Sequence, residues 1–156
     1  MRLLFVCTGN TCRSALAEAI ARQVADTRAF ASIEIASAGT SAWDGASASD
    51  GSLLVGMERA IDLSSHRARA LTPEMVAGAT LILAMGPHHV ERIEALGGRG
   101  KVHLLTDYAD RSTAGRAIVD PFGGGLEIYR ATADELQREV NLVFDRLATE
   151  RTSGAG

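Results

Sequence analysis

Short apolar runs alternate along the chain with segments in which apolar residues recur every three or four positions. A short, nearly continuous apolar run is typical of a strand buried on both faces of a parallel sheet, and the wider spacing is typical of an amphipathic helix. The runs predict four strands, over residues 2–7, 32–37, 80–85 and 101–105. The spacing predicts helices over residues 13–27, 50–61, 87–96 and 132–150, with a further helix that begins at Thr72 and Pro73.

This alternation predicts the architecture of the protein. Strands that alternate with helices form βαβ units with right-handed crossovers, so the expected fold class is α/β with a parallel sheet of about four strands. No internal repeat and no linker interrupts the pattern, and we expect one domain over residues 1–150 with a flexible tail over residues 151–156. The connection from 108 to 125 is long, and long loops are often functional.

Composition narrows the class of function. The 156 residues are 46% hydrophobic and 22% charged, as in ordinary globular proteins. A net charge of -3 argues against general affinity for nucleic acid or an anionic membrane surface. No apolar run approaches the ~20 residues that span a bilayer. The two cysteines share one short segment and make no disulfide framework, so a reducing cytoplasm is the simplest location.

The segment Cys7-Thr-Gly-Asn-Thr-Cys-Arg-Ser14 joins the first predicted strand to the first predicted helix. Ligands bind at the carboxyl ends of parallel strands, and the backbone N–H groups of such a loop converge on an anion beside the positive end of the helix. The same field favours a thiolate over a thiol, so we predict Cys7 as a nucleophile. The alternative is a buried structural cysteine at the end of a strand.

The remaining loop residues are predicted to bind phosphate. The planar guanidinium of Arg13 can grip two phosphate oxygens, and the Ser14 hydroxyl can donate to the Cys7 sulfur. A cysteine and an arginine separated by five residues occur often by chance, and only the strand before them and the helix after them strengthen the motif. The predicted phosphate-binding set is Thr8, Gly9, Asn10, Thr11, Cys12, Arg13 and Ser14.

A phosphoryl transfer also needs a proton donor for the leaving group, which Cys7 does not supply. Asp120 precedes Pro121 in the long loop before the last helix. Proline fixes the backbone there, and a loop position lets the carboxyl group reach over a pocket. We predict Asp120 as this acid; the alternative is an ordinary Asp-Pro turn.

These motifs together resemble the low-molecular-weight protein-tyrosine phosphatase family. The resemblance rests on the loop from Cys7 to Ser14 and on Asp120-Pro-Phe-Gly-Gly124, and it extends through Ser37-Ala-Gly39 and Ser65-His66-x-x-Arg69. It implies a three-layer α/β/α fold, Rossmann-like, with a four-stranded parallel sheet. It also implies a two-step reaction without metal or cofactor, in which Cys7 forms a cysteinyl-phosphate, Arg13 holds the phosphoryl oxygens and Asp120 acts first as acid and then as base.

The resemblance also suggests roles for residues around the loop. Asn10 would shape the loop, and Ser37 and His66 would support it, although a plain structural role for His66 is equally open. In relatives the equivalent of Cys12 forms a reversible disulfide with the nucleophile. Here Cys12 is either such a partner or simply a small, buried loop residue.

Three positions bear on the choice of substrate. Tyrosine-directed relatives usually carry a bulky aliphatic residue where this chain has Thr11, and often paired aromatics after Asp-Pro, where this chain has Phe122 and three glycines. Both differences resemble the bacterial protein-arginine phosphatase subgroup. Thr11 can hydrogen-bond near a guanidinium, and an ionised Asp120 would attract it. Trp43 is either an aromatic wall of the substrate site or a half-buried loop anchor. We expect phosphoarginine as the preferred substrate and phosphotyrosine as the alternative.

Other functions fit less well. Thioredoxin-coupled arsenate reductases share the loop but need further cysteines downstream, and none follows Cys12. A non-catalytic phosphoprotein-binding module would not need Cys7 and Asp120. No Cys/His pair matches Cys7 and Cys12 for zinc, and we expect His88 and His89 to face solvent. The expected partners are phosphorylated proteins, and the expected state is a monomer or weak dimer.

Overall fold

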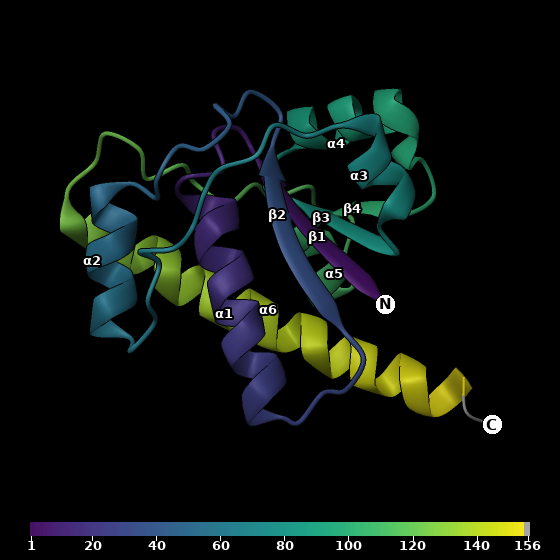
Figure 1. The fold of residues 1–156 in the computed structure, drawn as a ribbon. Helices are drawn as coiled ribbons and strands as arrows, with labels where there is room; N and C mark the ends of the chain where they lie inside the picture. Colours follow the sequence, from purple (N-terminus) through teal and green to yellow (C-terminus); the bar gives the residue numbers. More distant parts are fainter. Residues whose placement is uncertain (155–156) are drawn as a thin grey trace.

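Four strands form a single parallel sheet at the centre of the molecule (Figure 1). The computed structural model describes residues 1–154. The strands are β1 (Arg2–Cys7), β2 (Glu34–Gly39), β3 (Leu81–Ala84) and β4 (Val102–Leu104), in the order β2-β1-β3-β4. The central strand β1 pairs with both β2 and β3, and Val6 lies opposite Ala38 on one side and Ala84 on the other. The predicted four-stranded parallel sheet is confirmed.

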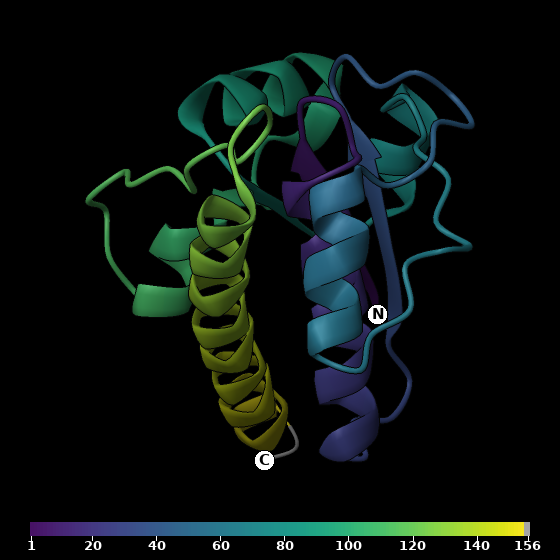
Figure 2. The same ribbon diagram turned by 90° about the vertical axis from the view of Figure 1, so that its left-hand side faces the viewer.

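Helices cover both faces of this sheet. Their bounds are α1 (Arg13–Thr27), α2 (Asp50–Glu58), α3 (Pro73–Gly78), α4 (Pro87–Ile93), α5 (Leu105–Asp110) and α6 (Leu126–Gly154), with a π-helical turn, η1 (Glu94–Gly98), after α4. Figures 1 and 2 place α1 and α6 side by side on one face, while α3 and α4 lie on the other. The three-layer α/β/α arrangement is therefore confirmed.

The burial of β1 on both faces explains its nearly continuous apolar sequence. Leu3 and Phe5 are buried in a cluster with apolar residues of α1, α5 and α6. Leu4 and Val6 point the other way, into a second cluster that includes Val76 of α3. Because side chains alternate along a strand, both sets must be apolar when both faces are covered. This packing fixes the strand whose carboxyl end carries Cys7.

Several predicted boundaries differ from the structure. β2 begins at Glu34, two residues later than expected, and α2 ends at Glu58 because Ala60 takes a left-handed backbone conformation (φ 58°). The apolar pattern did not predict α5, which begins at the end of the expected fourth strand and overlaps the start of the expected long loop. The last helix begins at Leu126, six residues before its predicted start at 132.

The last helix also continues past its predicted end at 150, through residues where the sequence predicts a tail. The Arg151 guanidinium lies 3.8 Å from the centre of the Phe30 ring, which gives this last turn a packing partner. Residues 155–156 lie outside the described residues. None of the helices over residues 1–154 has both the length and the apolar character needed to cross a membrane.

Candidate active site

The loop between β1 and α1 places Cys7 and Arg13 at the carboxyl edge of the sheet. Both residues are buried, and Cys7 Sγ lies 2.9 Å from Ser14 Oγ. Ser14 sits in the first turn of α1, so its hydroxyl reaches back under the end of β1. The predicted neighbours in the motif are thus brought together around the sulfur.

Asn10 lies at the centre of this loop and is completely buried. Its backbone has a positive φ of 57°, a conformation that asparagine tolerates better than most residues. One side-chain amide hydrogen goes to Ser14 Oγ (2.8 Å) and the other to Ser37 Oγ (2.9 Å). The amide oxygen accepts the backbone N–H of Arg69 (3.0 Å). Every hydrogen-bonding group of this side chain is therefore used.

These bonds also decide where the single Ser14 proton goes. Because Ser14 Oγ accepts from Asn10, its own hydrogen is free for another acceptor. The candidates are Cys7 Sγ at 2.9 Å and the Ala38 carbonyl oxygen at 3.5 Å, and the sulfur is much the closer. The arrangement suits a thiolate, which accepts hydrogen bonds and donates none.

Ser37 and His66 contact Asn10 from two other segments of the chain. Ser37 Oγ accepts from Asn10 and donates to Glu18 Oε1 (2.6 Å). His66 Nε2 lies 2.7 Å from the Asn10 carbonyl oxygen, which can only accept, so His66 carries its proton on Nε2. Both residues predicted to support the loop are thus in direct contact with it.

Gly39, at the end of β2, lets the loop pack against the sheet. A Cβ atom at this position would lie 2.4 Å from the Thr8 carbonyl oxygen and 3.0 Å from the Asn10 backbone nitrogen. The Ser41 backbone N–H donates to that Thr8 carbonyl oxygen (2.9 Å). Only glycine permits this approach, and it explains the Ser37-Ala-Gly39 sequence.

Arg13 reaches across the loop toward the segment that carries Asp120. One terminal nitrogen, Nη1, donates to the Ile118 carbonyl oxygen (3.1 Å), and Nη2 lies 3.5 Å from Asp120 Oδ2. Its Nε is buried and has no hydrogen-bond partner in the described part of the chain. A buried, unpartnered guanidinium N–H is costly unless an anion occupies the site. The orientation of Arg13 thus fits an oxyanion between the loop and Asp120.

The loop before Asp120 is attached to the body of the protein at three points. The Ile118 N–H donates to the Met85 carbonyl oxygen (2.8 Å), and Thr106 donates to the Arg116 carbonyl oxygen. The Arg116 guanidinium pairs with the buried Glu139 of α6 (2.8 Å). These contacts hold an otherwise exposed loop over the end of the sheet.

A cavity of about 220 Å³ unites the two motifs from opposite ends of the chain. Its lining comprises Cys7, Thr8, Gly9, Thr11, Cys12, Arg13, Asp120 and Phe122. The Asp120 side chain is half exposed, and its Oδ1 accepts the Phe122 backbone N–H (3.1 Å). This bond forms an Asx turn, as the ordinary Asp-Pro alternative expects, and the same carboxyl group lines a cavity with a buried cysteine and arginine, so its role as an acid stays a prediction.

Both aromatic residues predicted to set the substrate preference are strongly exposed. Phe122 lines the cavity with 74% of its surface exposed. Trp43 is 84% exposed, so its interpretation as a half-buried loop anchor is wrong. It does not line the cavity, and its role as an aromatic wall stays a prediction.

Cys12 is buried beside the cavity as a free thiol, as is Cys7. Its sulfur lies 3.2 Å from Ser49 Oγ and 3.4 Å from the Tyr129 hydroxyl. Burial and the contact with Cys12 raise the pKa of Tyr129, so its hydroxyl stays protonated. The contact with Tyr129 was not foreseen, because the two residues are 117 positions apart in the sequence.

His89 corrects another expectation from the sequence. His88 is exposed as predicted, but His89 is completely buried, and its Nε2 lies 2.9 Å from Thr8 Oγ1. The available signal was helical spacing, since His89 lies four positions before the buried Ile93 on α4. Burial lowers the pKa of His89 to about 4, with smaller effects from His88 and Arg13. The ring is therefore neutral near pH 7.

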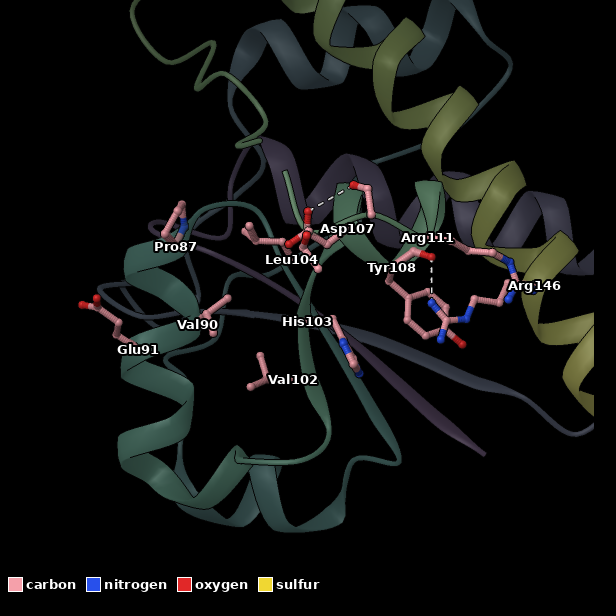
Figure 3. Close-up of a pocket in the computed structure, with 12 residues that line it drawn as sticks. Pro87, Val90, Glu91, Val102, His103, Leu104, Asp107, Tyr108, Arg111 and Arg146 are labelled. Carbon is pink, nitrogen blue, oxygen red and sulfur yellow. Dashed lines mark hydrogen bonds between the residues drawn. The ribbon is translucent and has the colours of Figure 1, made fainter. Parts of the chain in front are cut away.

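A larger cavity, of about 630 Å³, lies away from this site between α4, β4, α5 and α6 (Figure 3). Pro87, Val90 and Glu91 line one end of it, and Tyr108 with Arg146 lines the other. The Arg146 guanidinium stacks 3.9 Å from the Tyr108 ring centre. Neither Cys7 nor Asp120 lines this cavity, so the predicted catalytic residues lie in the smaller of the two cavities.

Comparison with known proteins agrees with this geometry. The family described as low molecular weight phosphotyrosine protein phosphatase matches residues 2–153. A protein-arginine-phosphatase of Geobacillus stearothermophilus is 37% identical over 150 residues, covering 96% of this chain and 98% of the relative. The tyrosine phosphatase PtpB of Staphylococcus haemolyticus is 39% identical over 139 residues, covering 87% and 92%.

A solved structure is also closely similar. It is a mutant of the arginine phosphatase YwlE with a phosphorylated active-site serine, and it superposes with a TM-score of 0.91 at 34% identity, covering 97% of this chain and 99% of the other. The chain belongs to the low-molecular-weight phosphotyrosine protein phosphatase family. It is therefore a protein phosphatase, whose reaction depends on a cysteine.

Proposed function

We propose that this protein is a protein-arginine phosphatase with Cys7 as nucleophile and Asp120 as general acid. The observation that carries the proposal is the cavity in which Thr11 and Asp120 lie beside a buried Cys7 and Arg13. The similarity to the Geobacillus stearothermophilus protein-arginine-phosphatase supports the same substrate.

The first chemical step forms a covalent intermediate. The Cys7 thiolate attacks phosphorus, an S–P bond forms, and the P–N bond of phosphoarginine breaks. Asp120 gives its proton to the departing nitrogen, so that arginine leaves without a developing negative charge. Arg13 and the loop N–H groups stabilise the equatorial oxygens, and the unpartnered Nε of Arg13 is available for one of them.

The second step regenerates the enzyme. Asp120, now a carboxylate, takes a proton from water while the water oxygen attacks phosphorus. The S–P bond breaks, inorganic phosphate is released, and the Ser14 hydroxyl stabilises the returning Cys7 thiolate from 2.9 Å. No metal and no cofactor enters either step.

The preference for phosphoarginine follows from hydrogen bonding. A guanidinium offers several N–H donors. The oxygen of the Thr11 hydroxyl and the C=O oxygen of the protonated Asp120 side chain can accept hydrogen bonds from them. The phenyl ring of phosphotyrosine has no N–H donors, so it would leave these two acceptors without partners. A site that hydrogen-bonds its substrate rejects an apolar analogue more strongly than an apolar site rejects a polar one. Phosphotyrosine is the second candidate, because the exposed Phe122 ring at the cavity can contact a phenol.

Kinetics on matched phosphoarginine and phosphotyrosine proteins test this proposal. The wild type should have a higher kcat/KM for phosphoarginine than for phosphotyrosine. Thr11→Ile should reduce the ratio of these two kcat/KM values. Thr149→Ile, on the exposed surface of α6, is the control. Cys7→Ser should abolish turnover, and Asp120→Ala should slow it by about 10²–10⁴-fold. A wild type that strongly prefers phosphotyrosine and a Thr11→Ile variant with an unchanged ratio would contradict the arginine preference.

We also propose phosphorylated proteins as the partners, the cytoplasm as the location and a monomer or weak dimer as the working state. The two free cysteines support a reducing compartment. Analytical ultracentrifugation over a range of concentrations tests the assembly state, and a tight dimer or larger oligomer would contradict it.

A further inference from the structure

The side chain of Thr8 is held by a buried histidine on a different element of the fold. Thr8 directly follows Cys7 and lines the same cavity as Cys7 and Asp120. Its carbonyl oxygen is fixed by the Ser41 N–H, and its hydroxyl lies 2.9 Å from His89 Nε2. Both ends of this residue are therefore positioned before substrate arrives.

The tautomer of His89 follows from its surroundings. A neutral imidazole has one N–H, on either Nδ1 or Nε2. Nδ1 is buried and has no hydrogen-bond partner in the described part of the chain. A proton on Nδ1 would make it an orphaned buried donor, which is rarer in proteins than an under-used acceptor. The proton therefore sits on Nε2, and His89 donates to Thr8 Oγ1.

This direction determines what the Thr8 hydroxyl can do. Because its oxygen accepts from His89, its own hydrogen remains free for an acceptor in the cavity. A substrate guanidinium offers only donors, whereas the phosphoryl group offers oxygen acceptors. We propose that Thr8 Oγ1 donates a hydrogen bond to a phosphoryl oxygen of the substrate, and that His89 is the positioning residue that directs this hydroxyl.

Charged groups around His89 are consistent with a fixed, neutral ring. The exposed His88 ring lies against it at a tilt of 43°, with 3.9 Å between ring centres. Arg13 and Asp120 act on it with opposite signs, and burial dominates, so that the pKa of His89 falls to about 4. The hydrogen bond to Thr8 therefore keeps the same direction across the neutral pH range.

The inference rests on the proposed Cys7 site but not on the proposed arginine preference. A phosphoryl oxygen is common to phosphoarginine, phosphotyrosine and inorganic phosphate, so the Thr8 hydroxyl should serve all three. A substitution at Thr8 and a substitution at Thr11 thus have separable effects: the first lowers activity on both substrates, and the second changes their ratio.

The experiment compares Thr8→Val with Thr8→Ser and uses inorganic phosphate as a competitive inhibitor. Thr8→Val keeps the shape of the side chain and removes the hydroxyl. It should weaken phosphate inhibition and kcat/KM on both substrates by about tenfold, in line with a hydrogen bond to a charged group. Thr8→Ser restores the hydroxyl and should stay within roughly twofold of wild type. Thr8→Val with unchanged phosphate inhibition and kcat/KM would overturn the proposal.

A double-mutant cycle tests the part assigned to His89. His89→Leu alone should weaken inhibition by phosphate. In a Thr8→Val background it should cause no further weakening, because His89 acts through the Thr8 hydroxyl. His88→Asn, at the exposed neighbouring position, is the control. Additive effects would contradict the coupling even where His89→Leu lowers stability. Nitrogen-15 NMR of the imidazole should show the Nε2–H tautomer, and an Nδ1–H tautomer would overturn the assignment.

Discussion

Asn10 donates a hydrogen bond of 2.8 Å to Ser14 Oγ and thereby points the only hydroxyl hydrogen of Ser14 at the Cys7 sulfur. The hydrogen bonding of the Cys7 sulfur is thus set by a residue that does not touch it. The amide of Asn10 can play this part because its oxygen is fixed by the Arg69 N–H, which excludes the flipped orientation.

Two substitutions of Asn10 should separate its backbone role from its side-chain role. Asn10→Gly keeps easy access to the positive φ of 57° and removes the amide. It should lower kcat, because Ser14 is no longer oriented, with a modest loss of stability. Asn10→Ala adds the strain of a left-handed backbone and should be less stable than Asn10→Gly by about 1 kcal/mol. Steady-state kinetics and urea denaturation measure the two effects. Equal stabilities with wild-type kcat would show that the amide network is not needed.

The close packing of Gly39 against Thr8 leads to a second prediction. Gly39→Ala places a Cβ 2.4 Å from the Thr8 carbonyl oxygen, so the loop from Cys7 to Ser14 or the end of β2 must move. We expect a loss of stability of about 1–3 kcal/mol and a lower kcat/KM. Gly125→Ala is the matched control, since its Cβ would meet nothing within 4 Å. Thermal denaturation and kinetics of the two variants should diverge clearly, and similar behaviour would contradict the steric argument.

Arg13 supplies a third prediction. The planar fork of arginine spans the Ile118 carbonyl oxygen and the Asp120 carboxylate and still leaves Nε for a phosphoryl oxygen. Lysine keeps the charge but offers a single ammonium, which cannot make these contacts together. Arg13→Lys should therefore lower kcat/KM by at least tenfold, whereas Arg22→Lys on the same helix, outside the cavity, should not. A fully active Arg13→Lys would show that charge alone suffices.

Most of the sheet and the position of the loop from Cys7 to Ser14 could be predicted from the sequence because their signals are local. The apolar run that ends at Cys7 and the helix that begins at Arg13 adjoin one another in the chain. By contrast, α5 is six residues long and too short to show a helical period. The early start of α6 was obscured by the glycines that precede Leu126, which favour a loop.

The contacts that complete the site could not be predicted in the same way. Asn10 hydrogen-bonds to Ser37 and Arg69, which are 27 and 59 residues away from it in the sequence. Thr8 and His89 are 81 residues apart. No periodicity links such residues, and only the folded arrangement brings them together. Family resemblance pointed to Ser37 and His66, whereas for His89 the sequence offered only its helical spacing to Ile93, which indicates burial but not a contact with Thr8.

The burial of His89 predicts a specific loss of stability in acid. The pKa of His89 falls from 6.5 to about 4 in the folded protein, so an unfolded chain takes up a proton at this residue well before the folded protein does. Between these two pH values the unfolded state holds more protons, and lowering the pH therefore decreases the free energy of unfolding. The contribution of the neutral His89 to stability is fully present above pH 6.5, the pKa in the unfolded chain. It decreases by up to about 3 kcal/mol as the pH falls to about 4, the pKa in the folded protein.

Urea denaturation of wild type and His89→Asn across that pH range measures this contribution. Asparagine keeps a hydrogen bond donor for Thr8 but does not titrate, so the variant should lose less stability in acid than the wild type does. The difference between their free energies of unfolding should narrow as the pH is lowered from 6.5 toward 4. His88→Asn removes the exposed neighbour, whose effect on the pKa of His89 is smaller than that of burial, so this variant should keep most of the wild-type slope. Parallel curves for wild type and His89→Asn would mean that the buried imidazole gains its proton as easily in the folded protein as in the unfolded chain.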